Sequence, residues 1–439
     1  MKKLINNSLY LPFIISILKY DYFPVISTFY IIILYSDKIK SKISTAALKF
    51  FIVIFLSLRF FSAISINLQS VWLNLSQKNY NLSGKFIDLQ SVFLSLNCNT
   101  DITFRYNLFG TEQILTCPHS VSYGPLFEII GLKNNPKIST LLTTFIVFVL
   151  FFYMYVQFIS EFNDDLNKQV ILTLLFISPP INFLLQRMNF DIIIFLTIYF
   201  VYKFSKNQYL QNLIIVFLGL LKYYPIIFII SNLIFNLICK QYKKIKIDIF
   251  FLLVYLFSIV YLNKILGIVT NPVLPFRPDR TFGVLSMYLN FNKVLNISYF
   301  FITCMFLFIL FVIIYLTKDT YVYSELFEID HKHNFLFTFI VLALLANYDY
   351  RLGILIFLSV SFIKSLDNIL FYSYVFFIMS SPGVLHSYGP LFSLVENYQI
   401  VYLDIPFLFF LILTIKEYLN FILIKLNLRK ITTGQNDFK

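Results

Sequence analysis

Charged residues are scarce in this chain of 439 residues. Asp, Glu, Lys and Arg make up 13% of it and hydrophobic residues 59%, and the mean hydropathy is +0.77. Soluble domains typically have about a quarter charged residues, so this composition excludes the ordinary soluble globular class. The sequence also lacks strict alternation of apolar and polar residues, which argues against membrane strands. The chain is therefore expected to have the lipid bilayer as its solvent.

Cysteine is rare as well, with 4 residues in the chain. Cys239 and Cys304 fall in or beside apolar runs, whereas Cys98 and Cys117 share one long polar segment that we place outside the cytoplasm. A disulfide between Cys98 and Cys117 and two unpaired thiols both remain open.

The first apolar stretch lacks the features of a cleavable signal peptide. It contains Lys19, Asp21 and Pro24 and has no small-residue cleavage site. We predict that residues 1–45 are a membrane-associated segment, whose path could be one tilted helix, a hairpin or an interfacial element.

Long apolar runs are abundant, and Lys and Arg in the short loops between them mark the cytoplasmic side. The clearest basic clusters are Lys38, Lys40 and Lys42, then Lys240, Lys243, Lys244 and Lys246, then Lys425, Arg429 and Lys430. Counting apolar runs between these clusters predicts an all-α polytopic membrane protein with about ten to thirteen transmembrane helices.

The predicted helices form a transmembrane domain over residues 46–423, followed by a cytoplasmic tail at 424–439. Extracytoplasmic loops are expected at about 67–137, 267–297 and 381–400, the first being the longest. The expected helices cover 46–66, 138–158, 168–185, 191–204, 210–221, 225–239, 247–265, 299–316, 335–346, 352–363, 369–380 and 402–423. Several are too short to span a bilayer alone, so broken or re-entrant helices are expected among them.

Polar and ionisable residues at the membrane are costly, so their positions are informative. In the predicted topology the unusual ones gather at the extracytoplasmic ends: Asp88, Tyr123 in a Gly-Pro turn, Asn189, Asp191, Lys222, Arg277, Arg280, Asp349, Arg351 and His386. Each has a simpler structural interpretation, such as Lys222 extending to the interface or Asp349 pairing locally with Arg351. Together, these cations facing one compartment predict a site for an anionic lipid-linked substrate, because phosphate needs fixed positive charge.

Five short segments follow one another in a recognisable order. They read DLQSV at 88–92, YGP at 123–125, QRMNFD at 186–191 before an apolar helix, GLLKYYP at 219–225, and NYDYRL at 347–352. This ordered set resembles the polyprenol-phosphate-sugar-dependent glycosyltransferases of the GT-C superfamily, particularly the branch of bacterial polyprenol-phosphate-mannose-dependent mannosyltransferases. The resemblance covers most of the chain from residue 46 onward.

The resemblance implies a GT-C-like bundle and an inverting hexosyltransferase in a bacterial inner membrane. Its donor would be a polyprenyl-phosphate sugar, mannose being the best-known case, and its acceptor a cell-envelope glycan or glycolipid at the extracytoplasmic face. Asp88 would be the general base, with Asp101 in reserve. Lys222 and Arg351 would stabilise the leaving phosphate. The remaining substrate-binding candidates are Arg277, Arg280, Asp349, Tyr350, Tyr123, Asn189 and Asp191, the last two equally interpretable as helix caps.

The sequence departs from better-known GT-C enzymes by lacking an adjacent acidic pair in the first external loop. We therefore predict no metal and no cofactor, with the lipid-phosphate sugar acting as substrate, and we expect no nucleic-acid partner. One alternative is a polymerase or ligase of lipid-linked oligosaccharides, although those enzymes usually rely on one dominant external loop. Another is a secondary transporter, which would predict matched halves of the chain. The sugar, acceptor, linkage, lipid length and oligomeric state are left open by the sequence.

Overall fold

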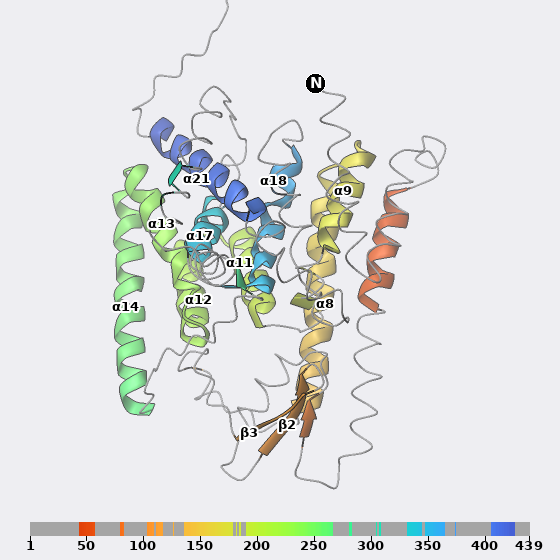
Figure 1. Ribbon diagram of the computed structural model, residues 1–439. Coiled ribbons are helices and arrows are strands. Elements are labelled where there is room, and N and C mark those ends of the chain that lie inside the picture. Colours follow the sequence, from red (N-terminus) through yellow and green to blue (C-terminus); the bar gives the residue numbers. More distant parts are fainter. Residues whose placement is uncertain are drawn as a thin grey trace, which may run out of the picture.

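The computed structural model describes part of the chain, and the account that follows concerns that part. The described residues are 44–57, 80–82, 103–108, 111–116, 126, 136–178, 181, 184–185, 190–266, 281–282, 304, 307–308, 332–344, 347–364, 374 and 405–425. They form a mainly helical body with a small sheet at one end (Figure 1). The predicted helical character is confirmed at this level, whereas the number of membrane passages stays a prediction.

Two helices in the described part are much longer than most of the others. Helix α8 covers Pro136–Ser160 and helix α14 covers Tyr242–Leu266, each with 25 residues. At 1.5 Å per residue each is roughly 37 Å long. Within them, Leu142–Ser160 and Tyr242–Leu262 are long and apolar enough to cross a membrane. The sequence predicted both helices, at 138–158 and 247–265.

The remaining described helices are shorter, and α21 with 21 residues is the longest of them. They are an unlabelled helix at Thr45–Ser57, α9 at Leu166–Phe176, α11 at Phe190–Phe204, α12 at Gln208–Leu221, α13 at Ile226–Ile238, α17 at Lys332–Leu344, the 3₁₀ helix η3 at Asp349–Leu358, α18 at Ser359–Lys364 and α21 at Ile405–Lys425. Helices α12 and α13 are each roughly 20 Å long, about half the length of α14.

Helices α12 and α13 form a hairpin that stops beside the middle of α14. Tyr255 of α14 lies roughly 20 Å from the first residue of that helix and roughly 16 Å from the last. Its ring packs against Gly219 near the end of α12, and its hydroxyl donates to the carbonyl oxygen of Tyr223 at 3.4 Å. The sequence predicted 210–221 and 225–239 as successive passages, with broken or re-entrant helices among the short ones. In the structure the two helices form a hairpin about half as long as α14, and their passage through a membrane stays a prediction.

A second hairpin, formed by α17 and η3, packs against the first. The side chain of Asn334 contacts Asn232 of α13, and the next residue, Phe335, packs on Phe228, which is closer to the tip of the first hairpin. Helix α17 therefore runs toward that tip. The 3₁₀ helix η3 returns beside it, with the rings of Phe357 and Phe335 stacked at 5.0 Å.

Helix α11 begins where α12 gives way to α13. Asp191, in the first turn of α11, lies against Lys222 and Tyr224 in the turn between α12 and α13. We call the place where these helix ends meet the break layer.

Short strands complete the described part. Strand β1 (Tyr80–Leu82) pairs in parallel with β2 (Thr103–Leu108), which pairs antiparallel with β3 (Thr111–Thr116). This sheet lies within the predicted first loop, at the end of the molecule where α8 begins and α14 ends (Figure 1). The sequence did not predict it. Strand β4 (Thr281–Phe282) pairs antiparallel with β5 (Asn347–Tyr348).

The core of the body is apolar and aromatic. Fully buried rings include Phe151, Phe176, Phe195 and Phe339. The rings of Phe151 and Phe176 lie 5.1 Å apart and join α8 to α9. Aromatic burial contributes a large apolar area per side chain, so contacts of this kind stabilise the packing of the helices.

Candidate functional site: a buried ion pair at the break layer

A lysine and an aspartate form an ion pair inside the helical body. The Nζ of Lys222 lies 2.6 Å from Oδ1 of Asp191, and the side chains are 4% and 0% exposed, respectively. Asp191 lies in the first turn of α11, and Lys222 directly follows α12. The pair therefore joins two of the helix ends that meet at the break layer.

Tyr224 is the third member of this site. Its hydroxyl donates to the same Oδ1 of Asp191 at 2.8 Å. The centre of its ring lies 5.9 Å from the Nζ of Lys222 and 5.9 Å from the ring of Phe195 on α11. One tyrosine thus contacts both members of the ion pair, through its hydroxyl on one side and its ring on the other.

The local sequence explains why the chain turns here. The backbone N–H of Lys222 still bonds to the carbonyl oxygen of Leu218 at 2.9 Å, but Lys222 has extended dihedral angles and ends α12. Pro225 then precedes the first residue of α13, a position where its lack of an N–H is tolerated. Gly219 allows the close approach to α14, because a Cβ there would lie 3.0 Å from the ring of Tyr255.

Burial makes this ion pair energetically expensive. Removing two charges from water costs several kcal/mol for each ion, and their attraction offsets this only in good geometry. The first-turn position of Asp191 helps, since the unpaired N–H groups at a helix N-terminus stabilise a negative charge. A buried pair of this kind is weak as a stabilising element, so its presence points to a functional role.

A second buried carboxylate clamps the base of the hairpin onto α14. Oδ1 of Asp248 accepts from the side-chain amides of Gln208 at 2.6 Å and Asn212 at 2.7 Å, and Oδ2 accepts from Asn236 at 2.7 Å. Asp248 is fully buried. Asp248 was not among the candidate residues expected from the sequence, although a lone acidic residue inside the apolar run of α14 is a visible signal.

A third polar cluster links α11, α13 and α17. Asn334 donates to Asn232 at 2.7 Å and to the hydroxyl of Tyr202 at 3.2 Å, and it accepts from Ser231 at 2.8 Å. Asn232 also donates to Tyr202 at 3.1 Å. This cluster fixes the height of α17 relative to the first hairpin. Sequence alone gave no sign that these separate residues meet.

The structure brings together two of the candidate residues expected from the sequence, Asp191 and Lys222. The interpretation of Lys222 as extending to the interface is wrong, because its ammonium is buried against Asp191. Asp191 belongs to the first turn of α11, and its Oδ1 is bound by side chains of the hairpin rather than serving only as a cap.

The 347–351 segment is described through its backbone. Asp349, Tyr350 and Arg351 form the first turn of η3, directly after β5. Strand β4, which follows Arg280 in the sequence, pairs with β5. The fold therefore joins the end of one predicted site segment to the start of another.

The other predicted residues lie outside the described part of the chain. They are Asp88, Asp101, Tyr123, Asn189, Arg277, Arg280, His386 and the cysteines Cys98 and Cys117. Among the described residues, no three side chains of His, Cys, Asp or Glu are grouped as a metal site would require.

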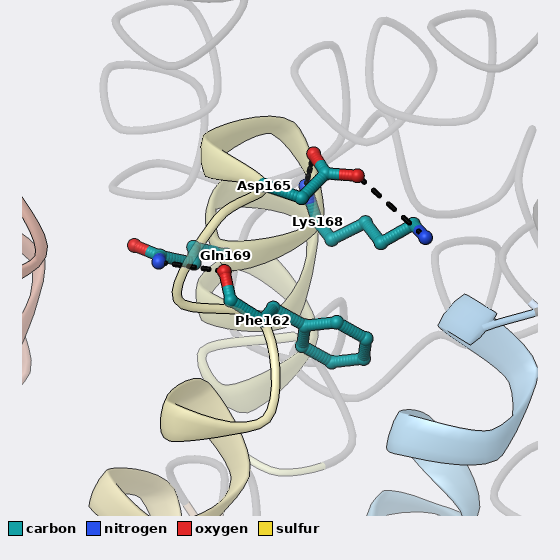
Figure 2. A network of polar contacts seen from close by, with 4 residues as sticks. All are labelled: Phe162, Asp165, Lys168 and Gln169. Atoms are coloured by element: carbon teal, nitrogen blue, oxygen red, sulfur yellow. Dashed lines mark hydrogen bonds and ion pairs between the residues drawn. The ribbon is translucent and has the colours of Figure 1, made fainter.

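An acid–lysine pair at the turn between α8 and α9 provides a reference for the buried pair. Figure 2 shows Asp165 accepting from the backbone N–H of Lys168 at 3.1 Å while its other oxygen lies 3.6 Å from Nζ of the same lysine. The side chains are 26% exposed for Lys168 and 41% for Asp165. Nearby, the amide of Gln169 donates to the carbonyl oxygen of Phe162 at 2.8 Å. This cluster caps a helix at the surface and needs no ligand to explain it.

No protein-family model, curated protein or solved structure matches the chain. The functional assignment therefore rests on the residues of the site.

Proposed function

We propose that this protein is a polytopic membrane glycosyltransferase that uses a polyprenyl-phosphate sugar as donor. In this proposal it transfers a hexose to a glycan or glycolipid of the cell envelope, at the extracytoplasmic face of a bacterial inner membrane. The observation that carries the proposal is the buried pair of Lys222 and Asp191 at the break layer. Both residues come from the segments that resemble the GT-C superfamily.

A membrane setting suits the outer surface of α14. Its large apolar side chains Leu253, Phe257 and Val260 are well exposed, and such side chains are stable against lipid rather than water. The basic residues Lys243, Lys244 and Lys246 lie in the first turns of the same helix, where the predicted topology places the cytoplasm. The opposite end of α14 then points to the extracytoplasmic side.

The chemistry needs a cation where charge develops on the leaving group. The acceptor hydroxyl attacks the anomeric carbon of the donor, the bond from that carbon to the phosphate oxygen breaks, and the phosphate leaves with the bonding electron pair. A carboxylate takes the hydroxyl proton, the role proposed for Asp88. Lys222 is suited to neutralise the phosphate, because a cation in a water-poor site acts strongly on developing charge.

The test is transfer of labelled hexose from polyprenyl phosphate to acceptors in membrane vesicles. Lys222→Met is expected to lower the rate at least about a hundredfold, in the range observed when one charge-stabilising donor is removed. Lys264→Met, which removes an exposed lysine near the far end of α14, is the matched control. Asp88→Asn is expected to abolish transfer at equal protein level. Full activity of Lys222→Met would exclude this role for the site.

A secondary transporter is the second candidate, and one observation favours it. The α12–α13 hairpin stops beside the middle of α14 and has an ion pair at its tip. Transporters place ion and substrate sites at such broken helices. Uptake of a phosphate-bearing solute into vesicles, without any transfer of label to acceptors, would support this second function and contradict the first.

A further inference from the structure

The ammonium of Lys222 and the hydroxyl of Tyr224 bind the same oxygen of one carboxylate. Nζ of Lys222 lies 2.6 Å from Oδ1 of Asp191, and the hydroxyl of Tyr224 lies 2.8 Å from that atom. A carboxylate oxygen has two lone-pair directions, so it accepts both donors at once. Both donors therefore stabilise the same negative charge.

The three groups differ in how freely they can move. Asp191 is fully buried and sits on a short stem in the first turn of α11. Lys222 carries its ammonium on a flexible four-carbon stem. Asp191 also keeps two supports that do not involve Lys222, namely the N-terminus of α11 and the hydroxyl of Tyr224. Departure of the ammonium would therefore leave the carboxylate stabilised.

Tyr224 is also placed to assist the ammonium itself. Its ring centre lies 5.9 Å from Nζ of Lys222, within the range in which an aromatic face attracts a cation. The ring is braced by Phe195 of α11, 5.9 Å away. The same side chain thus stabilises the carboxylate through its hydroxyl and lies within reach of the cation through its ring.

From this geometry we infer that Lys222 moves between Asp191 and the phosphate of the substrate, and that Tyr224 holds the charge of Asp191 while Lys222 is away. The inference rests on the proposed function for the nature of the substrate. It makes Asp191 a competitor of the phosphate, since an ammonium bound to a carboxylate attracts a second anion less. The apparent affinity for phosphate is reduced by the fraction of protein in which Asp191 keeps the lysine.

This competition predicts effects of opposite sign from two neighbouring substitutions. Asp191→Asn removes the competing charge, so phosphate is expected to bind about tenfold more tightly. Tyr224→Phe removes the support that Asp191 needs when the lysine leaves, so phosphate is expected to bind about tenfold more weakly. A purely structural role for the pair predicts weaker binding in both variants.

The experiment measures equilibrium binding to the purified full-length chain in lipid nanodiscs at pH 6. The probes are a short-chain polyprenyl phosphate and inorganic phosphate, and their comparison distinguishes a lipid-linked phosphate from a free one. Lys222→Met is expected to abolish binding of the preferred probe. Tyr209→Phe removes a tyrosine hydroxyl from an exposed position on α12 and serves as the matched control, with less than about a twofold change expected.

Each outcome decides one question. Weaker binding in Asp191→Asn, or unchanged binding in either Tyr224→Phe or Lys222→Met, overturns the exchange of Lys222. Should Asp191→Asn fail to fold, unchanged binding in Tyr224→Phe relative to Tyr209→Phe still overturns the exchange. If Asp191→Asn binds phosphate more tightly and Tyr224→Phe binds it more weakly, but the wild-type chain transfers no hexose, the exchange of Lys222 is supported and the proposed enzymatic function fails. If transfer occurs and Asp191→Asn binds phosphate more weakly, the function stands and the exchange fails.

Discussion

Two aspartate–lysine pairs in this protein have the same chemistry and different surroundings. Asp165 and Lys168 lie 3.6 Å apart at a helix start near the surface, with both side chains partly exposed. Asp191 and Lys222 lie 2.6 Å apart in the interior, from two different helices. Water screens the charges of the first pair and is excluded from the second. The strength of the interaction therefore depends on burial, because the residue types are the same in both pairs.

The largest expected difference between the pairs concerns single substitutions. Asp191→Asn leaves the buried ammonium of Lys222 without its carboxylate and is expected to lower the free energy of unfolding by about 3–5 kcal/mol. Lys222→Met leaves Asp191 with the hydroxyl of Tyr224 and the helix N-terminus, so a smaller loss of about 1–3 kcal/mol is expected. Lys168→Met and Asp165→Asn are expected to lower it by less than about 1 kcal/mol, because the pair is exposed and Asn still caps α9. Thermal unfolding in nanodiscs measures all four. Equal losses at the two sites would remove the distinction.

A double substitution sharpens the comparison. Replacing both members, as Asp191→Leu with Lys222→Met, removes both charges and is expected to be less destabilising than either single change. The coupling between the two substitutions should be about 3 kcal/mol for the buried pair. For Asp165→Asn with Lys168→Met it should stay below about 0.5 kcal/mol. Additive losses at the buried site would indicate that the two side chains do not interact in solution.

Substitution of Asp248 tests how much a buried carboxylate bound by amide side chains contributes to stability. The structure surrounds it with the amides of Gln208, Asn212 and Asn236. Asp248→Asn keeps the shape but weakens the charge-assisted hydrogen bonds, and a loss of about 1–3 kcal/mol is expected. Hydrogen exchange should rise at the start of α12 and the end of α13, which the carboxylate joins. Unchanged exchange there would exclude its role as a clamp of the hairpin.

The smallest expected effect comes from the contact that sets the depth of the hairpin. A Cβ on Gly219 would meet the ring of Tyr255 at 3.0 Å, closer than ordinary contact. Gly219→Ala is expected to cost about 1–2 kcal/mol, because crowding outweighs the gain in helix propensity. The loss should appear in thermal unfolding together with a weakened phosphate affinity. A stabilised Gly219→Ala would show that the tip of the hairpin packs less closely against α14.

The sequence predicted most of the described helices but not how they pack against one another. Helices α8 and α14 match the predicted runs at 138–158 and 247–265, because a long apolar run has few alternatives to a helix. The bounds of α12 and α13 also match the predicted runs. Hydropathy, however, does not show whether two successive short helices form a hairpin beside a longer helix. The predicted helices at 299–316 and 369–380 fall largely outside the described residues.

The candidate site shows the same division. Asp191 and Lys222 stood out in the sequence because ionisable residues beside apolar runs are rare. Nothing in the sequence indicated that the two residues pair. The sequence also contained no sign of the hydrogen bond from the hydroxyl of Tyr224 to Asp191, which is 33 residues away in the sequence. The cluster around Asp248 combines residues from α12, α13 and α14, so only the packing of these helices brings it together.

The sequence by itself determined that the chain is apolar and helical and that a few ionisable residues interrupt its apolar runs. These properties follow from composition and from local patterns, which act over a few residues. Only the tertiary structure decided that α12 and α13 turn back beside the middle of α14, that Lys222 is buried, and that Asp191 is its partner. Burial and pairing depend on contacts between segments distant in sequence, and those contacts form when the helices pack.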